Sequence, residues 1–189
     1  MKKILLILGN PKTKSLCRSL ADAYEKEAKK AGAEIRRINI GDLKFNPVLK
    51  EGYDKIQKLE PDLKKAQDDI RWADHLVFVF PSWWASMPAV LKGFIDRVFL
   101  PGFAFNFRPG KLLPAQHLKG KTGRLLITMG APRFVYWGIF CPGAQIVKMG
   151  TFYYCGIKPT RVTLFPSIAP DRKYDKYIEK ARKLGARLK

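Results

Sequence analysis

Apolar and polar positions follow two alternating periods along this chain, and these periods predict alternating strands and helices. A short apolar run covers Lys3–Leu8. From Leu16 to Ala31 apolar residues recur every three or four positions, and Gly32 follows as a helix C-terminal residue. Ala33–Ile40 then alternates apolar and polar residues, as in a strand with one less covered face.

The middle of the chain repeats this alternation. Tyr53–Trp72 carries a helical pattern with a candidate break near Pro61, and His75–Phe80 is a continuous apolar run typical of a buried parallel strand. A helix is predicted over Pro88–Phe99. The irregular stretch Pro101–Lys119 has phenylalanines at every second position, from 103 to 107, which favours a short hairpin or an extended flap.

The C-terminal part adds two strands, Arg124–Thr128 and Thr160–Phe165, and helices over Gly143–Cys155 and from Tyr174. Residues Met129–Pro142 are interpreted as a glycine- and aromatic-rich loop. Five strands with intervening helices require right-handed crossovers and predict an α/β fold: a doubly wound, five-stranded parallel sheet of order 2-1-3-4-5 with helices on both faces.

Composition fits one ordinary globular domain over residues 1–189, with 47% hydrophobic and 28% charged residues. The three cysteines are unclustered and lack CxxC spacing, which argues against a disulfide framework or a zinc site and favours the cytoplasm. No apolar segment approaches the roughly 18 residues of a membrane span.

The formal net charge of +20 is unusual for a chain of 189 residues. Such a charge attracts nucleic acid, anionic membranes or phosphorylated cofactors. Here the lysines and arginines are spread over the whole chain and interleaved with acids, with no basic arm. We therefore interpret most of the charge as solvated helix faces, and we expect no nucleic-acid partner.

The first segment with candidate chemistry is Gly9–Cys17, between the first strand and the first helix. Ser15 stands at the helix N-cap position, where free N–H groups and the helix dipole favour an anion. Ser15 as a simple capping residue is an equally good interpretation. The loop lacks the GxxxxGK[ST] and GxGxxG patterns, so it suits a terminal monophosphate.

Two further loops are predicted to meet this one. Pro81–Met87 carries the adjacent indoles Trp83 and Trp84, and Gly130–Tyr136 follows the fourth strand. With the predicted strand order, all three loops share the carboxyl edge of the sheet, where ligands bind in open α/β folds. A paired indole wall suits a flat conjugated ring, although core packing of the tryptophans is the alternative. Together the loops predict a flavin mononucleotide (FMN) site.

The segment Phe80–Phe99, followed by Gly102–Phe105, resembles the flavodoxin-like NAD(P)H:quinone oxidoreductases, the family of quinone reductases and modulator-of-drug-activity proteins. The first loop, Lys44–Leu49 and Thr128–Ala131 extend the resemblance over nearly the whole chain. It implies a flavodoxin-like fold, two-electron reduction of quinones by NADH or NADPH, and a homodimer.

The resemblance also implies where a flavin would be held. Ser15, the N–H groups of Leu16 and Cys17, and Asn10 would hold its phosphate. The residues along its ring would be Pro81, Ser82, Trp83, Trp84 and Ala85, and those at its pyrimidine end would be Thr128, Met129, Gly130 and Ala131. FMN is favoured over FAD by the short chain and the modest first loop, whereas the mammalian relatives use FAD.

The chemistry implied by the resemblance needs a proton donor for the reduced acceptor. Tyr136 is the candidate catalytic phenol. A histidine that some family members place beyond this tyrosine is missing here, and we expect His75, His117 and Cys141 to have no catalytic role. We also expect the carboxylates of Asp68 and Asp69 to lie on a solvated helix face.

Two other functions remain open from the sequence. Some relatives of this fold are flavin-binding regulatory subunits of potassium-efflux transporters, and a basic surface favours docking to a membrane protein or to anionic lipid. A flavodoxin-like carrier of single electrons is the second alternative. Such carriers are usually acidic, and this chain is basic.

Overall fold

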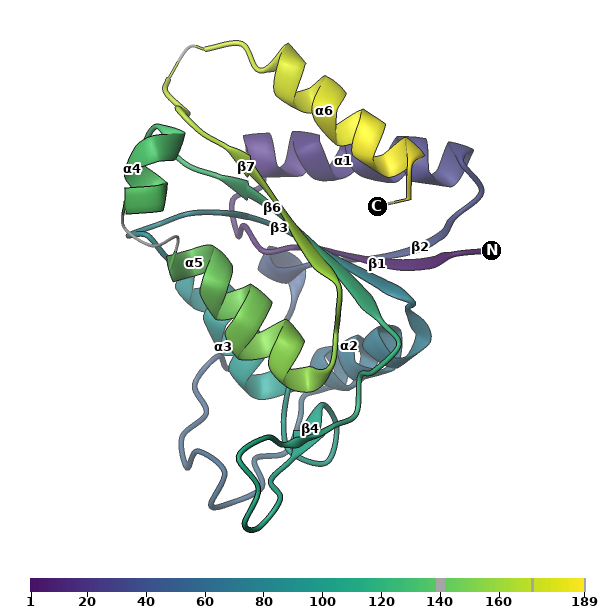
Figure 1. Ribbon diagram of the computed structural model, residues 1–189, viewed down its shortest axis with the longest axis vertical. Coiled ribbons are helices and arrows are strands. Elements are labelled where there is room, and N and C mark those ends of the chain that lie inside the picture. The colour runs from purple at the N-terminus through teal and green to yellow at the C-terminus, as the bar shows by residue number, and fades with distance from the viewer. Residues whose placement is uncertain (139–141, 171, 189) are drawn as a thin grey trace.

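The computed structural model describes residues 1–138, 142–170 and 172–188, with the side chains of 136–138 outside the description. Five parallel strands form one sheet in the order β2-β1-β3-β6-β7 (Figure 1). Their bounds are β1 Lys3–Leu8, β2 Glu34–Asn39, β3 His75–Pro81, β6 Thr122–Thr128 and β7 Thr160–Phe165. Counted within this sheet, the order is 2-1-3-4-5, so the predicted topology is confirmed.

Helices cover both faces of the sheet (Figure 1). One face carries α1 (Leu16–Lys30) and α6 (Asp175–Ala186), which pack against each other. The other carries α2 (Pro61–Trp72), α3 (Ala89–Val98), and α5 (Pro142–Gln145) running into η2 (Ile146–Tyr153). Two short elements complete the set, η1 (Ile40–Asp42) and α4 (Arg133–Gly138). None of the helices within the described residues has the length and apolar character that a membrane crossing requires.

The position of strand β3 in the sheet explains why residues 75–81 form a continuous apolar run. It lies between β1 and β6, and all seven of its residues are buried. Alternate residues face the two helical layers: Phe78 packs in the core under α2 and α3, and Val79 packs in the core under α1. A strand buried on both faces has no polar face to show in its sequence.

Two predicted segments differ from the structure. The helix expected over Tyr53–Trp72 begins only at Pro61, because proline is favoured in the first helical turn and disfavours helix before it. Tyr53 instead packs edge-on against Phe105. The loop expected over Met129–Pro142 contains helix α4.

The alternating phenylalanines form the predicted hairpin. Strand β4 (Phe105–Asn106) pairs antiparallel with β5 (Ala115–Gln116), at the bottom of the molecule in Figure 1. The helix predicted over Gly143–Cys155 is confirmed, but its central eight residues, Ile146–Tyr153, have π-helical hydrogen bonding, which apolar periodicity does not reveal.

A buried arginine fixes the irregular segment before α2. The side chain of Arg97, on α3, is fully buried and donates to the carbonyl oxygens of Asn46 and Lys58. It also forms an ion pair with Glu60 at 2.8 Å. These three partners tie residues 46–60 to α3, the helix that follows the Pro81–Met87 loop.

His75 makes stability depend on pH. It is 3% exposed at the start of β3, and Thr122 Oγ1 lies 2.7 Å from its Nδ1. Burial, and then the charges of Lys2 and Arg124, lower its pKa to about 3. The unfolded chain takes up this proton near pH 6.5 and the folded chain does not, so acidification favours unfolding.

We therefore expect the free energy of unfolding to fall below pH 6.5, with a slope that approaches about 1.4 kcal/mol per pH unit near pH 5. Urea titrations at pH 6.5, 5.75 and 5 measure this slope. The variant His75→Gln should flatten it, whereas His117→Gln, at an exposed position, should keep it. Equal slopes in wild type and His75→Gln would contradict the assignment.

Candidate functional site

The three loops singled out in the sequence meet at the carboxyl edge of the sheet, as predicted. Cys17 Sγ, at the start of α1, lies 3.2 Å from Thr128 Oγ1 at the end of β6. The backbone N–H of Ser82 donates to the carbonyl oxygen of Thr128 at 2.7 Å. Thr128 therefore joins the first loop to the second, and its own strand leads into the third.

The first loop presents the N-terminus of α1. Ser15 is the N-cap residue, and its Oγ accepts a hydrogen bond from the N–H of Arg18 at 3.2 Å. The first-turn N–H groups of Leu16 and Cys17 have no intrahelical acceptor. Asn10 is buried and its Oδ1 accepts from the N–H of Lys12 at 3.0 Å, which forms a tight turn in the loop before α1.

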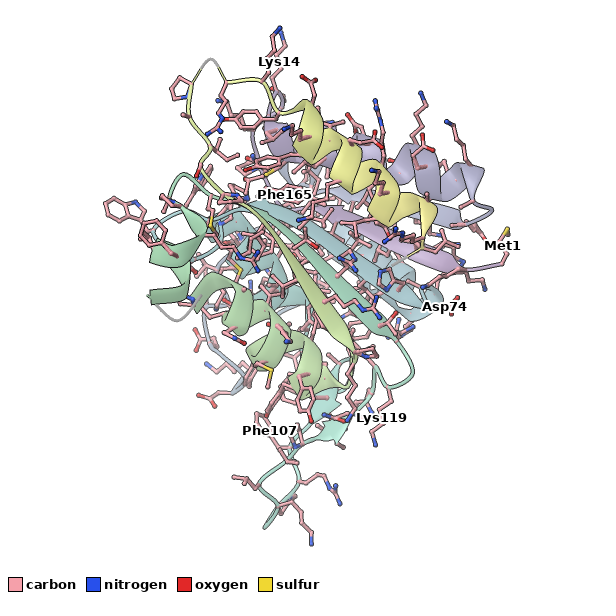
Figure 2. The ribbon with its side chains drawn as sticks, turned by 45° about the horizontal axis from the view of Figure 1, so that its top comes forward. Met1, Lys14, Asp74, Phe107, Lys119 and Phe165 are labelled. Atoms are coloured by element: carbon pink, nitrogen blue, oxygen red, sulfur yellow. The ribbon has the colours of Figure 1, made fainter. Side chains whose placement is uncertain are left out.

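Positive charge surrounds this helix terminus. Lys12 and Lys14 are exposed on the loop, and Figure 2 shows Lys14 projecting outward from the top of the molecule. The first turn of α1 has no acidic residue. An anion at this terminus therefore meets free N–H groups, the positive end of the helix dipole and two lysines.

Cys17 is a neutral structural thiol in this setting. Burial raises its pKa to about 11, against the lowering effect of hydrogen bonds with Thr128 and Asn10. A thiol with this pKa is protonated at neutral pH and is not a nucleophile. Cys141, set aside as a redox group in the sequence analysis, lies outside the described residues.

The second loop is a tight and strained turn. The N–H of Trp83 donates to the carbonyl oxygen of Ser86, and the N–H of Ser86 donates back to Trp83, each at 2.9 Å. The two residues between them, Trp84 and Ala85, have φ angles of 51° and 57°. This left-handed conformation costs roughly 1–2 kcal/mol for each residue that is not glycine. Strain of this kind gathers at functional sites.

The tryptophans of this turn are not core residues. Trp84 is fully exposed at 101%, and Trp83 is 46% exposed. Two adjacent indoles in water, held on a strained turn, form an apolar surface ready for a flat ligand or a partner. The alternative that the tryptophans pack in the core is therefore wrong for Trp84. Trp83 is half-buried and packs against the protein with only part of its side chain.

The third loop leaves the end of β6. Met129 is buried, Gly130 is exposed and Ala131 is half-buried. A side chain at Gly130 would have only the carbonyl oxygen of Ile168 within 4 Å, at 3.7 Å, so the backbone here is open to a ligand. Tyr136 belongs to helix α4, and its side chain lies outside the described part of the chain.

Two contributors to this edge were missed by the sequence analysis. The N–H of Gly143, on α5, donates to the carbonyl oxygen of Ala85 at 2.8 Å and thereby supports the tryptophan turn. The segment after β7 joins the third loop, because the N–H of Ser167 donates to Ala131 and that of Ile168 donates to Met129. Backbone contacts of this kind leave no residue-type signal. Within the described residues, no cluster of His, Cys, Asp and Glu side chains is suited to a metal.

The strain of the turn is measurable. Replacing Ala85 by glycine should relieve its left-handed conformation, and we expect the free energy of unfolding to rise by about 0.5–1 kcal/mol. The matched control is Ala31→Gly, at the end of α1, where φ is −79° and the same change should destabilise by about 0.5–1 kcal/mol. Urea unfolding of both variants tests this; a loss of stability in Ala85→Gly equal to that of the control would show that the turn is unstrained.

Comparison with known proteins identifies the family. A family described as having a flavodoxin-like fold matches residues 2–188. The ribosyldihydronicotinamide dehydrogenase [quinone] of Mus musculus is 30% identical, over 83% of this chain and 78% of that protein. An uncharacterized NAD(P)H oxidoreductase of Haemophilus influenzae is 29% identical, over 87% and 83% of the two chains.

Solved structures agree with this. Smu.1420 from Streptococcus mutans UA159 superimposes with a TM-score of 0.82 at 28% identity, covering 98% of this chain and 99% of that one. The NAD(P)H:quinone oxidoreductase from Methanothermobacter marburgensis shares the fold, with a TM-score of 0.82 at 20% identity over 100% and 99% of the two chains. The chain therefore belongs to the family of flavodoxin-like NAD(P)H:quinone oxidoreductases.

Proposed function

We propose that this protein is a flavin-dependent NAD(P)H oxidoreductase that reduces quinones or similar aromatic acceptors. The observation that carries the proposal is the meeting of a helix N-terminus, a pair of exposed indoles and an open glycine loop at one edge of the sheet. The names of the relatives support the same reaction, with quinones as acceptors in the mouse and archaeal proteins.

The residues at this edge fit a flavin mononucleotide. The phosphate would be held by Ser15 Oγ and the N–H groups of Leu16 and Cys17, with Asn10 beside them. This assignment fits the cap geometry, because the free N–H groups and the helix dipole both favour a terminal monophosphate. Lys12 and Lys14 add attraction at longer range.

The ring would lie along the second loop and end at the third. Trp83 and Trp84 supply the apolar wall, and the backbone of Pro81, Ser82 and Ala85 supplies hydrogen-bonding groups. The residues at the pyrimidine end would be Thr128, Met129, Gly130 and Ala131. When bound, the flavin supplies two-electron transfer at N5 between the nicotinamide and the quinone.

The chain's own contribution is to position and shield the reactants. The indoles would exclude water from one side of a bound ring, and N–H groups of the loops would oppose negative charge on a bound group. The oxygens of the reduced quinone need protons, and Tyr136 is our candidate donor. His75 and His117 lie away from this edge: His75 heads β3 at the opposite end of the strand, and the His117 N–H bonds to Ala104 beside the hairpin.

FMN is the cofactor we favour over FAD, because the N-terminus of α1 suits a terminal monophosphate and the first loop is short. An azoreductase structure from Bacillus anthracis that shares the fold is described as FMN-dependent and contains FMN. Its sequence is 17% identical to this chain. NADH and NADPH both remain candidate reductants.

A homodimer is also part of the proposal. A cavity of about 300 Å³ lies between the segment before α2, the hairpin and η2, with Tyr53, Phe107 and Ile146 in its lining. All three are more than one-third exposed, and Figure 2 shows Phe107 on the lower hairpin. Met149 and Tyr153 extend this apolar surface along η2.

We expect sedimentation equilibrium to give twice the chain mass of 21.6 kDa. A charge placed in the apolar surface should weaken the dimer, so Met149→Glu should shift the mass toward one chain, while Lys26→Glu, on the exposed side of α1, should leave it unchanged. A wild-type mass of one chain at micromolar concentration would contradict the dimer.

The enzymatic activity is tested by NADH and NADPH oxidation with a quinone, using FMN-loaded protein. We expect quinone-dependent oxidation with ping-pong kinetics, because reductant and acceptor use the same site in turn. Trp83→Ala should lower kcat/KM at least 10-fold and keep the fold, whereas Trp72→Ala, remote from the loops, should keep activity in the folded fraction. Wild-type activity in Trp83→Ala would show that the Trp83 indole does not contribute to the site.

A further inference from the structure

A strongly basic cavity lies on the uncovered edge of β7, and one of its lining residues, Arg133, comes from the third loop. Strand β7 is the last strand of the sheet and passes between α6 and α5 (Figure 1). The cavity has a volume of about 520 Å³. Its charged lining residues are Arg124, Arg133, Lys148, Arg161 and Lys180, and no carboxylate lies among the described lining residues.

Arg124 is the most unusual member of this lining. It is 4% exposed on β6, and its Nη1 donates to Thr163 Oγ1 at 2.8 Å. Its Nε is buried with no acceptor in the described part of the chain, and no described carboxylate is among the groups that act on its charge. A buried guanidinium without an anion costs several kcal/mol. An anion bound in the cavity would therefore lower the free-energy cost of burying Arg124.

Three further cations converge on Arg124 from separate elements. Arg161 stands opposite Arg124 in the β6–β7 register, so the two side chains share a face of the sheet. Lys180 comes from α6 and Arg133 from α4. Burial, and then the charges of Arg133 and Arg124, lower the pKa of Lys180. Like charges held together from four elements repel one another unless an anion is bound between them.

We propose that this cavity binds the phosphate groups of a small soluble phosphorylated ligand. Guanidinium groups match phosphate oxygens in pairs, and lysine adds a point charge. Thr163 Oγ1 accepts from Arg124, which leaves its own proton to donate to a phosphate oxygen. Arg124 lies four residues before Thr128 on β6, roughly 13 Å along the strand. None of the residues proposed to hold the flavin lines this cavity, so the two sites are distinct even though Arg133 comes from the third loop.

Calorimetric titration of FMN-loaded protein with pyrophosphate, at constant ionic strength, tests the proposal. We expect one saturable site per chain. Arg161→Gln/Lys180→Gln changes two exposed positions and keeps the buried Arg124, and it should weaken pyrophosphate binding at least 10-fold. The control Lys26→Gln/Lys111→Gln removes the same charge from exposed positions outside the cavity and should keep wild-type affinity.

Other outcomes would overturn the proposal. Absence of pyrophosphate binding, or equal weakening in the two double variants, would mean that the cavity is not a specific phosphate site and attracts anions only through the net positive charge of the protein. Binding to phosphatidic-acid vesicles without binding to pyrophosphate would assign it to a membrane surface instead. The variant Ser15→Glu should keep pyrophosphate affinity even where flavin binding is lost, so failure of the flavin site and failure of this site are separately visible.

Discussion

Ser15→Glu is expected to weaken FMN binding about 100-fold or more, a loss of ~2.7 kcal/mol or greater. The carboxylate would occupy the helix terminus where the phosphate belongs and would repel it. Its own charge suits the positive end of the helix dipole, so α1 should stay folded. Quenching of flavin fluorescence on titration into apoprotein measures the dissociation constant directly.

The matched control is Ser19→Glu. Ser19 lies one turn later on α1, is exposed, and gains the same charge without standing at the helix terminus. We expect its FMN affinity to stay within a few-fold of wild type. If Ser15→Glu bound FMN as tightly as Ser19→Glu does, the phosphate would have to bind elsewhere.

Arg97→Met is expected to lower the free energy of unfolding by about 3–5 kcal/mol. The guanidinium is fully buried, and its removal leaves the carbonyl oxygens of Asn46 and Lys58 without this donor. The Glu60 carboxylate loses its ion pair and keeps the hydrogen bond from the N–H of Asn46. Methionine fills much of the same volume, so the loss reports hydrogen bonds more than a cavity. Urea titration with a shared m-value measures the change.

The control for this prediction is Lys92→Met on the same helix. Lys92 pairs with Asp96 at 2.7 Å, but both side chains are more than one-third exposed. An exposed pair is worth about 0–1 kcal/mol. A cost for Arg97→Met no larger than for Lys92→Met would mean that residues 46–60 are held by other contacts.

The strands could be predicted from the sequence because burial leaves a clear pattern, and their order followed from the doubly wound fold class. The runs Lys3–Leu8 and Thr160–Phe165 are strands β1 and β7 with the same bounds. The proximity of the three loops followed from that order alone, since carboxyl ends of parallel strands share an edge.

Features that depend on tertiary contacts were not predictable. Asp69 was expected on a solvated face, but it is 2% exposed and pairs with Arg36 at 2.9 Å and Lys65 at 2.6 Å. A helical pattern cannot show that a strand residue such as Arg36 reaches over it. The left-handed turn at Trp84 and Ala85 was hidden for a similar reason, because neither residue type announces a positive φ angle.

The anaerobic visible spectrum of protein that has been saturated with FMN and desalted shows whether this chain is a flavin-dependent reductase. We expect a retained flavin band that bleaches on addition of NADH or NADPH and returns when a quinone is added. A retained band that ignores both nicotinamides would contradict the reductase and favour a carrier or regulatory protein. Loss of the band after desalting, with FAD giving the same result, would contradict the flavin site itself.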